Sequence, residues 1–82
     1  MNTPPDIILI GNNIRKWRAL KGIKQTDFAN QIGISKSTLS KIENGRQNIS
    51  LIRMLLIAEI LNIKTTQLLK DPLEFFPNNN NI

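Results

Sequence analysis

Apolar residues recur along this chain at spacings of three and four, the periodicity of α-helices, and no segment alternates as a β-strand does. The first helix is predicted from about Ile8 to Leu20. Its inward face comprises Ile10, Ile14, Trp17 and Leu20. Gly22 follows, and glycine tolerates the left-handed conformation that commonly closes a helix. The pattern therefore predicts an amphipathic helix that ends before Gly22.

Two shorter helices are predicted next, separated by a tight turn. The first of them starts near Gln25, and its inward residues are Phe28, Ala29 and Ile32. Gly33 ends this helix, and Ile34 fills the turn that follows. Ser35 is a favourable N-cap for the next helix, which is expected to end at Asn44-Gly45. The pair forms a predicted helix–turn–helix.

The remainder of the chain is also predicted to be helical. Ser50 caps a fourth helix that runs to about Leu61. Thr65 or Thr66 opens a short fifth helix, which stops before Pro72 because the residue before a proline disfavours helical dihedrals. The predicted fold is all-α, with a flexible arm at 1–7, a folded domain at 8–70 and a tail at 71–82. The asparagines at 78–81 are expected to be disordered.

Composition narrows the classes of function. The 82 residues make one small domain without cysteine or histidine, so disulfides and the commonest zinc ligands are absent. The six acidic residues are scattered and no glycine-rich phosphate loop occurs, so we expect neither an enzyme nor a cofactor. No apolar run is long enough to span a membrane, and the N-terminus lacks the basic start of a signal peptide. A cytoplasmic location is therefore expected.

The charge is positive and unevenly placed. The formal net charge is +5, and the stretch from Arg15 to Lys24 holds five basic residues and no acid. Such a distribution favours a polyanionic partner, although a mildly basic surface also serves solubility alone.

The predicted third helix has one apolar and one polar side. Thr38, Leu39 and Ile42 gather on the first side. The second side carries Lys36, Ser37, Ser40, Lys41 and Asn44. An α-helix fits the major groove of DNA, where these donors can contact base edges and phosphates. The alternative is an ordinary solvated surface. Gln25, at the start of the preceding helix, and Arg46, after the third helix, are the expected phosphate contacts.

The joint spacing of these residues resembles a known family. Gln25, Ala29, Gly33, Ser35, Leu39, Ser40, Glu43, Asn44 and Gly45 are similar to the Q-x-x-x-A-x-x-x-G-x-S-x-x-x-[IL]-S-x-x-E-x-G pattern of the phage repressor/Cro-like, or XRE-type, helix-turn-helix regulators. Met54, Ile57, Ala58 and Leu61 resemble the downstream L-x-x-I-A-x-x-L element. The resemblance implies a five-helix lambda-repressor-like domain with the helix-turn-helix at its second and third helices.

The resemblance also assigns roles to single residues. The implied DNA-binding set is Gln25, Thr26, Ser35, Lys36, Ser37, Ser40, Lys41, Asn44 and Arg46. Within it, Lys36, Ser37 and Lys41 are placed on base edges or adjacent phosphates. Arg18 and Glu43 are implied to form a structural ion pair outside the DNA site. A carboxylate on the inner edge of a helix needs such a donor to be tolerated.

The predicted fourth helix is apolar on two faces. One face comprises Leu51, Met54, Ile57, Ala58 and Leu61, and is expected to pack under the helix-turn-helix. The other comprises Ile52, Leu55, Leu56 and Ile60, with Ile63 just beyond. A helix that is apolar all round is buried on more than one side. The second face predicts a homodimer on a palindromic operator, in which the tail aromatics Phe75 and Phe76 also take part. Alternatively, it is covered by the chain's own Ile7, Leu9, Phe75 and Phe76.

The expected function is sequence-specific regulation of transcription, with repression favoured over activation. Two alternatives share the fold: an antitoxin that also binds a toxin, and the controller protein of a restriction–modification system. A third is a protein-interaction module that does not bind DNA.

Overall fold

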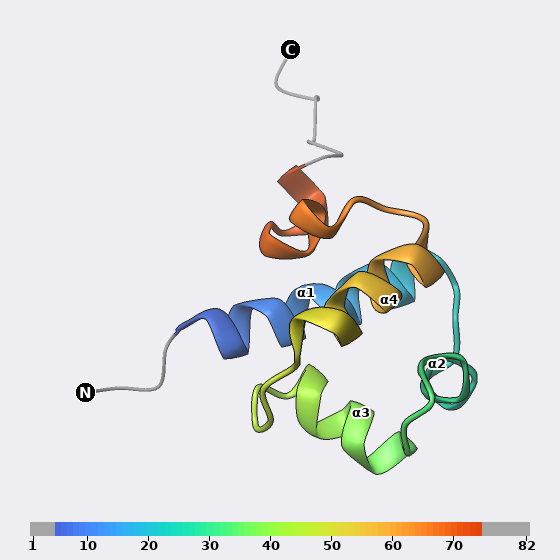
Figure 1. Cartoon of the computed structure of the whole chain (residues 1–82). Coiled ribbons are helices and arrows are strands. Elements are labelled where there is room, and N and C mark those ends of the chain that lie inside the picture. The colour runs from blue at the N-terminus through green and yellow to red at the C-terminus, as the bar shows by residue number, and fades with distance from the viewer. Residues whose placement is uncertain (1–4, 75–82) are drawn as a thin grey trace.

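The computed structural model describes residues 5–74, which form a set of helices without a strand (Figure 1). The four α-helices are α1 (Pro5–Leu20), α2 (Gln25–Ile32), α3 (Lys36–Glu43) and α4 (Leu51–Leu61). Two 3-10 helices follow, η1 (Thr65–Leu69) and η2 (Pro72–Glu74). The all-α class is thereby confirmed. The five-helix detail is not, because the predicted fifth helix is the 3-10 segment η1.

The first helix begins earlier than the sequence pattern suggested. α1 starts at Pro5 rather than near Ile8, so residues 5–7 of the predicted arm are helical. Proline is well tolerated in a first helical turn, where its missing N–H would have no partner. The tail prediction is altered in the same way, since 72–74 form η2. The predictions for 1–4 and for 75–82, including Phe75, Phe76 and the asparagines, lie outside the described residues.

The core draws one large side chain from each of five elements. Trp17, Phe28, Leu39, Ile57 and Leu68 come from α1, α2, α3, α4 and η1, and none is more than 1% exposed. α3 packs on both α1 and α2, while η1 packs on α1 and α4. In Figure 1, α2 and α3 consequently lie on one side of the molecule, and η1 and η2 lie on the other.

Two residues that were expected to face the core are exposed. Leu20 is 56% exposed and Leu51 is 66% exposed. Leu20 is the last residue of α1, and Leu51 is the first residue of α4. Each has the correct helical spacing but stands at a helix end, where more than half of its surface stays exposed. Periodicity identifies the inward side of a helix without showing how far along it the neighbours extend.

Local caps fix the ends of the central helices. Ser35 Oγ accepts from the backbone N–H of Thr38 at 3.0 Å, and Ser50 Oγ accepts from that of Arg53 at 3.1 Å, as predicted for both serines. Gly33 adopts φ +87°, the left-handed conformation, and ends α2. The turn between α2 and α3 is therefore short and sterically defined.

Gly11 and Asn13 are buried residues that the sequence pattern did not single out. A Cβ on Gly11 would lie 2.0 Å from the backbone oxygen of Ile42, so glycine is required where α1 crosses α3. Asn13 is fully buried and its Nδ2 donates to Leu68 O at 2.9 Å. Trp17 Nε1 adds a bond to Gln67 O at 3.2 Å. These two donors hold η1 against α1.

Candidate nucleic-acid interface

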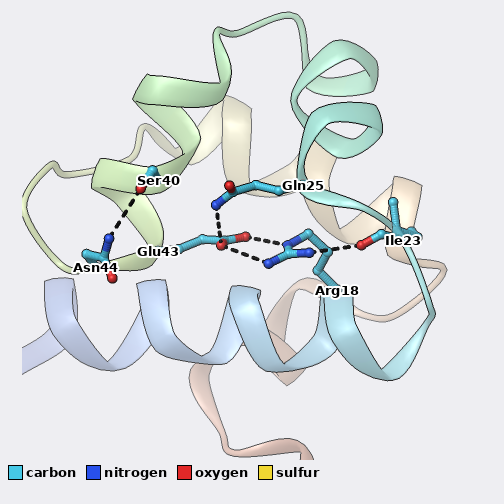
Figure 2. A network of polar contacts seen from close by, with 6 residues as sticks. All are labelled: Arg18, Ile23, Gln25, Ser40, Glu43 and Asn44. Atoms are coloured by element: carbon cyan, nitrogen blue, oxygen red, sulfur yellow. Dashed lines mark hydrogen bonds and ion pairs between the residues drawn. The ribbon is translucent and has the colours of Figure 1, made fainter.

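A polar network joins α1, α2 and α3 at the centre of the helix-turn-helix (Figure 2). Arg18 Nε donates to Glu43 Oε2 at 2.7 Å, and Arg18 Nη2 donates to Glu43 Oε1 at 3.1 Å. Arg18 Nη1 also donates to Ile23 O at 2.9 Å, in the α1–α2 loop. Gln25 Nε2 donates to Glu43 Oε1 at 3.0 Å. Arg18 and Glu43 thus form the ion pair that the resemblance implied.

Glu43 occupies a position where a lone carboxylate would be costly. Its side chain is 2% exposed and it is the last residue of α3, next to the negative end of the helix dipole. The two-pronged guanidinium of Arg18 compensates both the burial and the dipole. Removing one partner of a buried pair costs about 3–5 kcal/mol, because the other charge is left uncompensated.

The outward face of α3 is cationic and rich in hydrogen-bond donors. Lys36, Ser37, Lys41 and Asn44 are exposed, and Ser40 is half-buried. Asn44 Nδ2 donates to Ser40 Oγ at 3.3 Å, which holds these two side chains together. The one acid of α3, Glu43, is buried and paired, so the exposed face of the helix carries no negative charge. Such a face can donate to an anionic surface along the length of α3.

The start of α2 contributes a second cluster of donors. Thr26 is exposed and Gln25 is half-buried. Lys24, the N-cap residue, is exposed and makes no side-chain cap bond, so no side chain closes the N–H groups of the first turn. The sequence pattern did not include Lys24 in the site. It also treated Gln25 as free for a phosphate, whereas one N–H of its amide is bound to Glu43.

Arg46 and Ser35, two other predicted site residues, are both exposed, but only the side chain of Ser35 has hydrogen bonds within the described residues 5–74. Arg46 is exposed in the loop after α3. Ser35 is exposed, but its hydroxyl accepts from Thr38 N–H and donates to Thr38 Oγ1 at 2.9 Å. The side chain of Ser35 is therefore engaged in capping α3, and its predicted contact with DNA has a competitor inside the protein.

The second apolar face of α4 is divided. Ile52 is 80% exposed, Leu55 50% and Leu56 37%, and Leu51 joins them at the start of the helix. Ile60 and Ile63, which were grouped with this face, are half-buried and pack against the core. The uncovered apolar surface is therefore restricted to the first half of α4. We call the surface of Leu51, Ile52, Leu55 and Leu56 the α4 patch.

A sequence model described as "Helix-turn-helix" matches residues 14–68, from α1 through η1. The chain is 37% identical over 65 residues to control protein C.MunI of Mycoplasma sp., covering 78% of this chain and 88% of that protein. It is 41% identical over 58 residues to the uncharacterized HTH-type transcriptional regulator YazB of Bacillus subtilis, covering 71% and 84%. Antitoxin PezA of Streptococcus pneumoniae is 34% identical over 55 residues, covering 67% of this chain but 35% of that protein.

Solved structures agree with the sequence relatives. The restriction–modification controller protein C.AhdI of Aeromonas hydrophila superposes with a TM-score of 0.73 at 31% identity, covering 79% of this chain and 98% of that chain. SinR of Bacillus subtilis, a master regulator of biofilm formation solved in complex with DNA, has a TM-score of 0.68 at 32% identity, covering 74% and 98%.

Among residues 5–74, no helix is long and apolar enough to cross a membrane. The chain therefore belongs to the XRE-type helix-turn-helix family of transcriptional regulators, which bind DNA and are not enzymes.

Proposed function

We propose that α3 enters the major groove of duplex DNA, with Lys36, Ser37 and Lys41 at base edges or adjacent phosphates. The observation that carries this proposal is the outward face of α3, where these three side chains are exposed and no carboxylate is exposed. Lysine donates to guanine O6 and N7, and serine donates to or accepts from any base. Short side chains at Ser37 and Ser40 let the helix backbone approach the bases closely.

The phosphate contacts in this proposal flank α3. Gln25 and Thr26 stand at the start of α2, and Asn44 and Arg46 stand at the end of α3. Backbone N–H groups at the start of α2 add to this cluster, because a helix N-terminus attracts anions. Phosphate contacts of this kind fix the register of the protein on the duplex without selecting a sequence. For Ser35 we propose a phosphate contact through its backbone, because its hydroxyl is engaged in capping α3.

We further propose that two copies bind together through the α4 patch. Four exposed apolar side chains in one helix are expected to be covered, and a second copy supplies an equivalent patch across a two-fold axis. A dimer would present two α3 helices to half-sites about 34 Å apart on a palindromic operator. Binding over a promoter would then act by repression. A cytoplasmic location stays a prediction that follows from this function.

The oligomer proposal can be tested by static light scattering at micromolar concentration. The native protein is expected to have a dimer mass. Ile52→Asp should give a folded monomer, because a charge would be buried at the centre of the interface. Leu20→Asp, at an apolar side chain of α1 that is also exposed, should leave the dimer intact. A native monomer, or a dimer that survives Ile52→Asp, would favour cover of α4 by the tail that includes Phe75 and Phe76.

The controller role is a second candidate, favoured by the likeness to C.MunI and C.AhdI over nearly their whole lengths. Simple repression predicts that expression falls as the protein concentration rises, so expression that rises at any concentration would favour the controller role. The antitoxin role requires a protein partner and stays a prediction. Reporter expression from a promoter carrying the selected site, measured over a range of protein concentration, separates the first two roles.

Selection of bound sequences from random duplex DNA, followed by a salt titration, tests the function itself. The proposal predicts enrichment of a two-fold symmetric site. It also predicts affinity that falls as a power of salt concentration, because phosphate contacts release counterions. Absence of enrichment together with binding that is insensitive to salt would reject DNA recognition and favour a protein-interaction module.

A further inference from the structure

We propose that Glu43 is a positioning residue for DNA binding, and that its carboxylate orients the Gln25 amide at the phosphate-facing start of α2. This inference rests on the proposed function, in which Gln25 contacts a phosphate. It extends the role of the Arg18–Glu43 pair beyond holding the fold together.

The Gln25–Glu43 contact has one direction, from the amide nitrogen as donor to the carboxylate as acceptor. Glu43 Oε1 receives a hydrogen bond from Arg18 Nη2 at 3.1 Å and another from Gln25 Nε2 at 3.0 Å. An ionised carboxylate has acceptors and no donor, so it can face the nitrogen of a glutamine amide but not its oxygen. The amide of Gln25 therefore has one favourable orientation, with Oε1 turned away from Glu43.

The carboxylate that sets this orientation is buried and bound through both of its oxygens. The side chain of Glu43 is 2% exposed and that of Arg18 is 15% exposed, and both carboxylate oxygens bind the guanidinium. Arg18 Nη1 is itself tied to Ile23 O at 2.9 Å. Figure 2 shows the carboxylate between the guanidinium and the Gln25 amide. The carboxylate has little freedom, so its hydrogen bond holds Gln25 in one place before DNA arrives.

One N–H of the Gln25 amide remains available for a DNA phosphate. A glutamine amide has two N–H donors, and Glu43 uses one of them. Within residues 5–74, neither the second N–H nor Oε1 of Gln25 has a protein partner. The second N–H can donate to a phosphate, whereas a reversed amide would direct an oxygen toward the phosphate and repel it. Ordering the side chain in advance also removes part of the entropy cost of binding.

A double-mutant cycle on DNA affinity tests the coupling. The variants are Gln25→Met, which keeps the length of the side chain, Glu43→Gln, which keeps its shape, and the combination of both. Affinity for a fixed duplex is measured by fluorescence anisotropy at a temperature where circular dichroism shows each variant folded. Gln25→Met and Glu43→Gln are each expected to weaken binding about tenfold, the size of one lost charge-assisted hydrogen bond. The double variant should be no weaker than Gln25→Met.

Glu59→Gln provides a matched control, because Glu59 is an exposed carboxylate on α4. It changes the net charge by the same amount as Glu43→Gln. Removing a negative charge strengthens binding to DNA by long-range electrostatics, so Glu59→Gln should bind equally well or more tightly. Glu43→Gln also removes a negative charge, which by itself would strengthen binding. Weaker binding by this variant therefore cannot come from the charge change and is the result that the positioning role requires. Unchanged or tighter binding by folded Glu43→Gln, or losses that add in the double variant, would overturn the inference.

Side-chain NMR of the unmodified free protein provides a test that does not depend on how the variants fold. The ¹⁵N-labelled amide of Gln25 should show restricted motion in relaxation measurements, close to that of the helix backbone. The amides of Gln31 and Gln47, which are exposed, serve as internal references. A Gln25 amide as mobile as these two would overturn the inference. If the native protein binds no duplex even in dilute buffer, the proposed function itself fails; loss of coupling with native binding intact rejects the positioning role alone.

Discussion

Lys41 is the residue whose replacement separates base contacts from general electrostatics. It is exposed in the last turn of α3, whereas Lys70 is exposed and directly follows η1, an element that lies on the other side of the molecule (Figure 1). Lys41→Ala is expected to weaken binding to the selected site by about 1–3 kcal/mol and to relax specificity at one position. Lys70→Ala removes the same charge and should have a small effect that is equal for all sequences. Equal losses for both variants on all duplexes would remove Lys41 from the base-contacting set.

Gly11 is the residue at which the packing of α1 on α3 leaves no space. An added methyl group would lie 2.0 Å from a backbone oxygen, which cannot move without shifting α3. Gly11→Ala is therefore expected to destabilise the fold by about 1–3 kcal/mol, although alanine is the better helix former. Asn30→Ala, at an exposed position of α2, should be near neutral. Urea unfolding followed by circular dichroism compares them, and equal midpoints would contradict the described crossing.

At the level of the single helix, Ser35 and Ser37 are neighbours with separable roles. Ser35 Oγ caps α3 through Thr38 N–H, while Ser37 is exposed on the face proposed to meet DNA. Ser35→Ala should lower the free energy of unfolding by about 0.5–2 kcal/mol, the usual effect of losing an N-cap. Ser37→Ala should leave stability unchanged and alter affinity for the selected site. Thermal unfolding of both variants checks the assignment. A Ser35→Ala protein that unfolds at the same temperature as the native protein would contradict it.

Helix boundaries were predictable where they depend on neighbouring residues. The caps at Ser35 and Ser50 and the left-handed Gly33 are properties of a few consecutive residues, so spacing and residue type sufficed to locate α2, α3 and α4. The 3-10 character of η1 was not predictable in this way. η1 receives hydrogen bonds from Asn13 and Trp17 of α1, which lie 55 and 50 positions before their partners Leu68 and Gln67.

At the level of the whole molecule, the contacts that escaped prediction join residues far apart in the chain. Asn13 and Leu68, and likewise Lys16 and Asp71, are separated by 55 positions. No periodicity relates such pairs. The identity of a residue as asparagine or lysine does not indicate which distant residue it will contact. The Arg18–Glu43 pair was accessible only through the family resemblance, and its contact with Gln25 was missed because it depends on how α2 and α3 meet.

The link between Lys16 and Asp71 predicts a pH dependence. Lys16 Nζ lies 2.5 Å from Asp71 Oδ2, and this bond, followed by a hydrogen bond from the Leu73 backbone N–H, lowers the pKa of Asp71 below its ordinary value of 3.8. A lowered pKa in the folded state means that ionised Asp71 stabilises the fold above 3.8, and that this contribution is lost as the pH falls through the lowered value.

Asp71→Asn should therefore unfold more easily than the native protein at pH 7, and the difference should narrow as the pH is lowered below 3.8. Lys16→Ala removes the first cause of the shift and should show the same convergence. Urea midpoints measured between pH 7 and pH 2 provide the comparison. A difference that stays constant over this range would show that the ion pair does not stabilise the fold.

Contact of the α3 face with duplex DNA is tested most directly by amide NMR spectra recorded during titration with the selected duplex. The largest chemical-shift changes are expected at the start of α2, along α3 and at Arg46, while η1 and the second half of α4 are expected to change little. Shift changes centred on η1 and the C-terminal end of α1, with α3 unaffected, would contradict this expectation. So would the absence of any change at low salt.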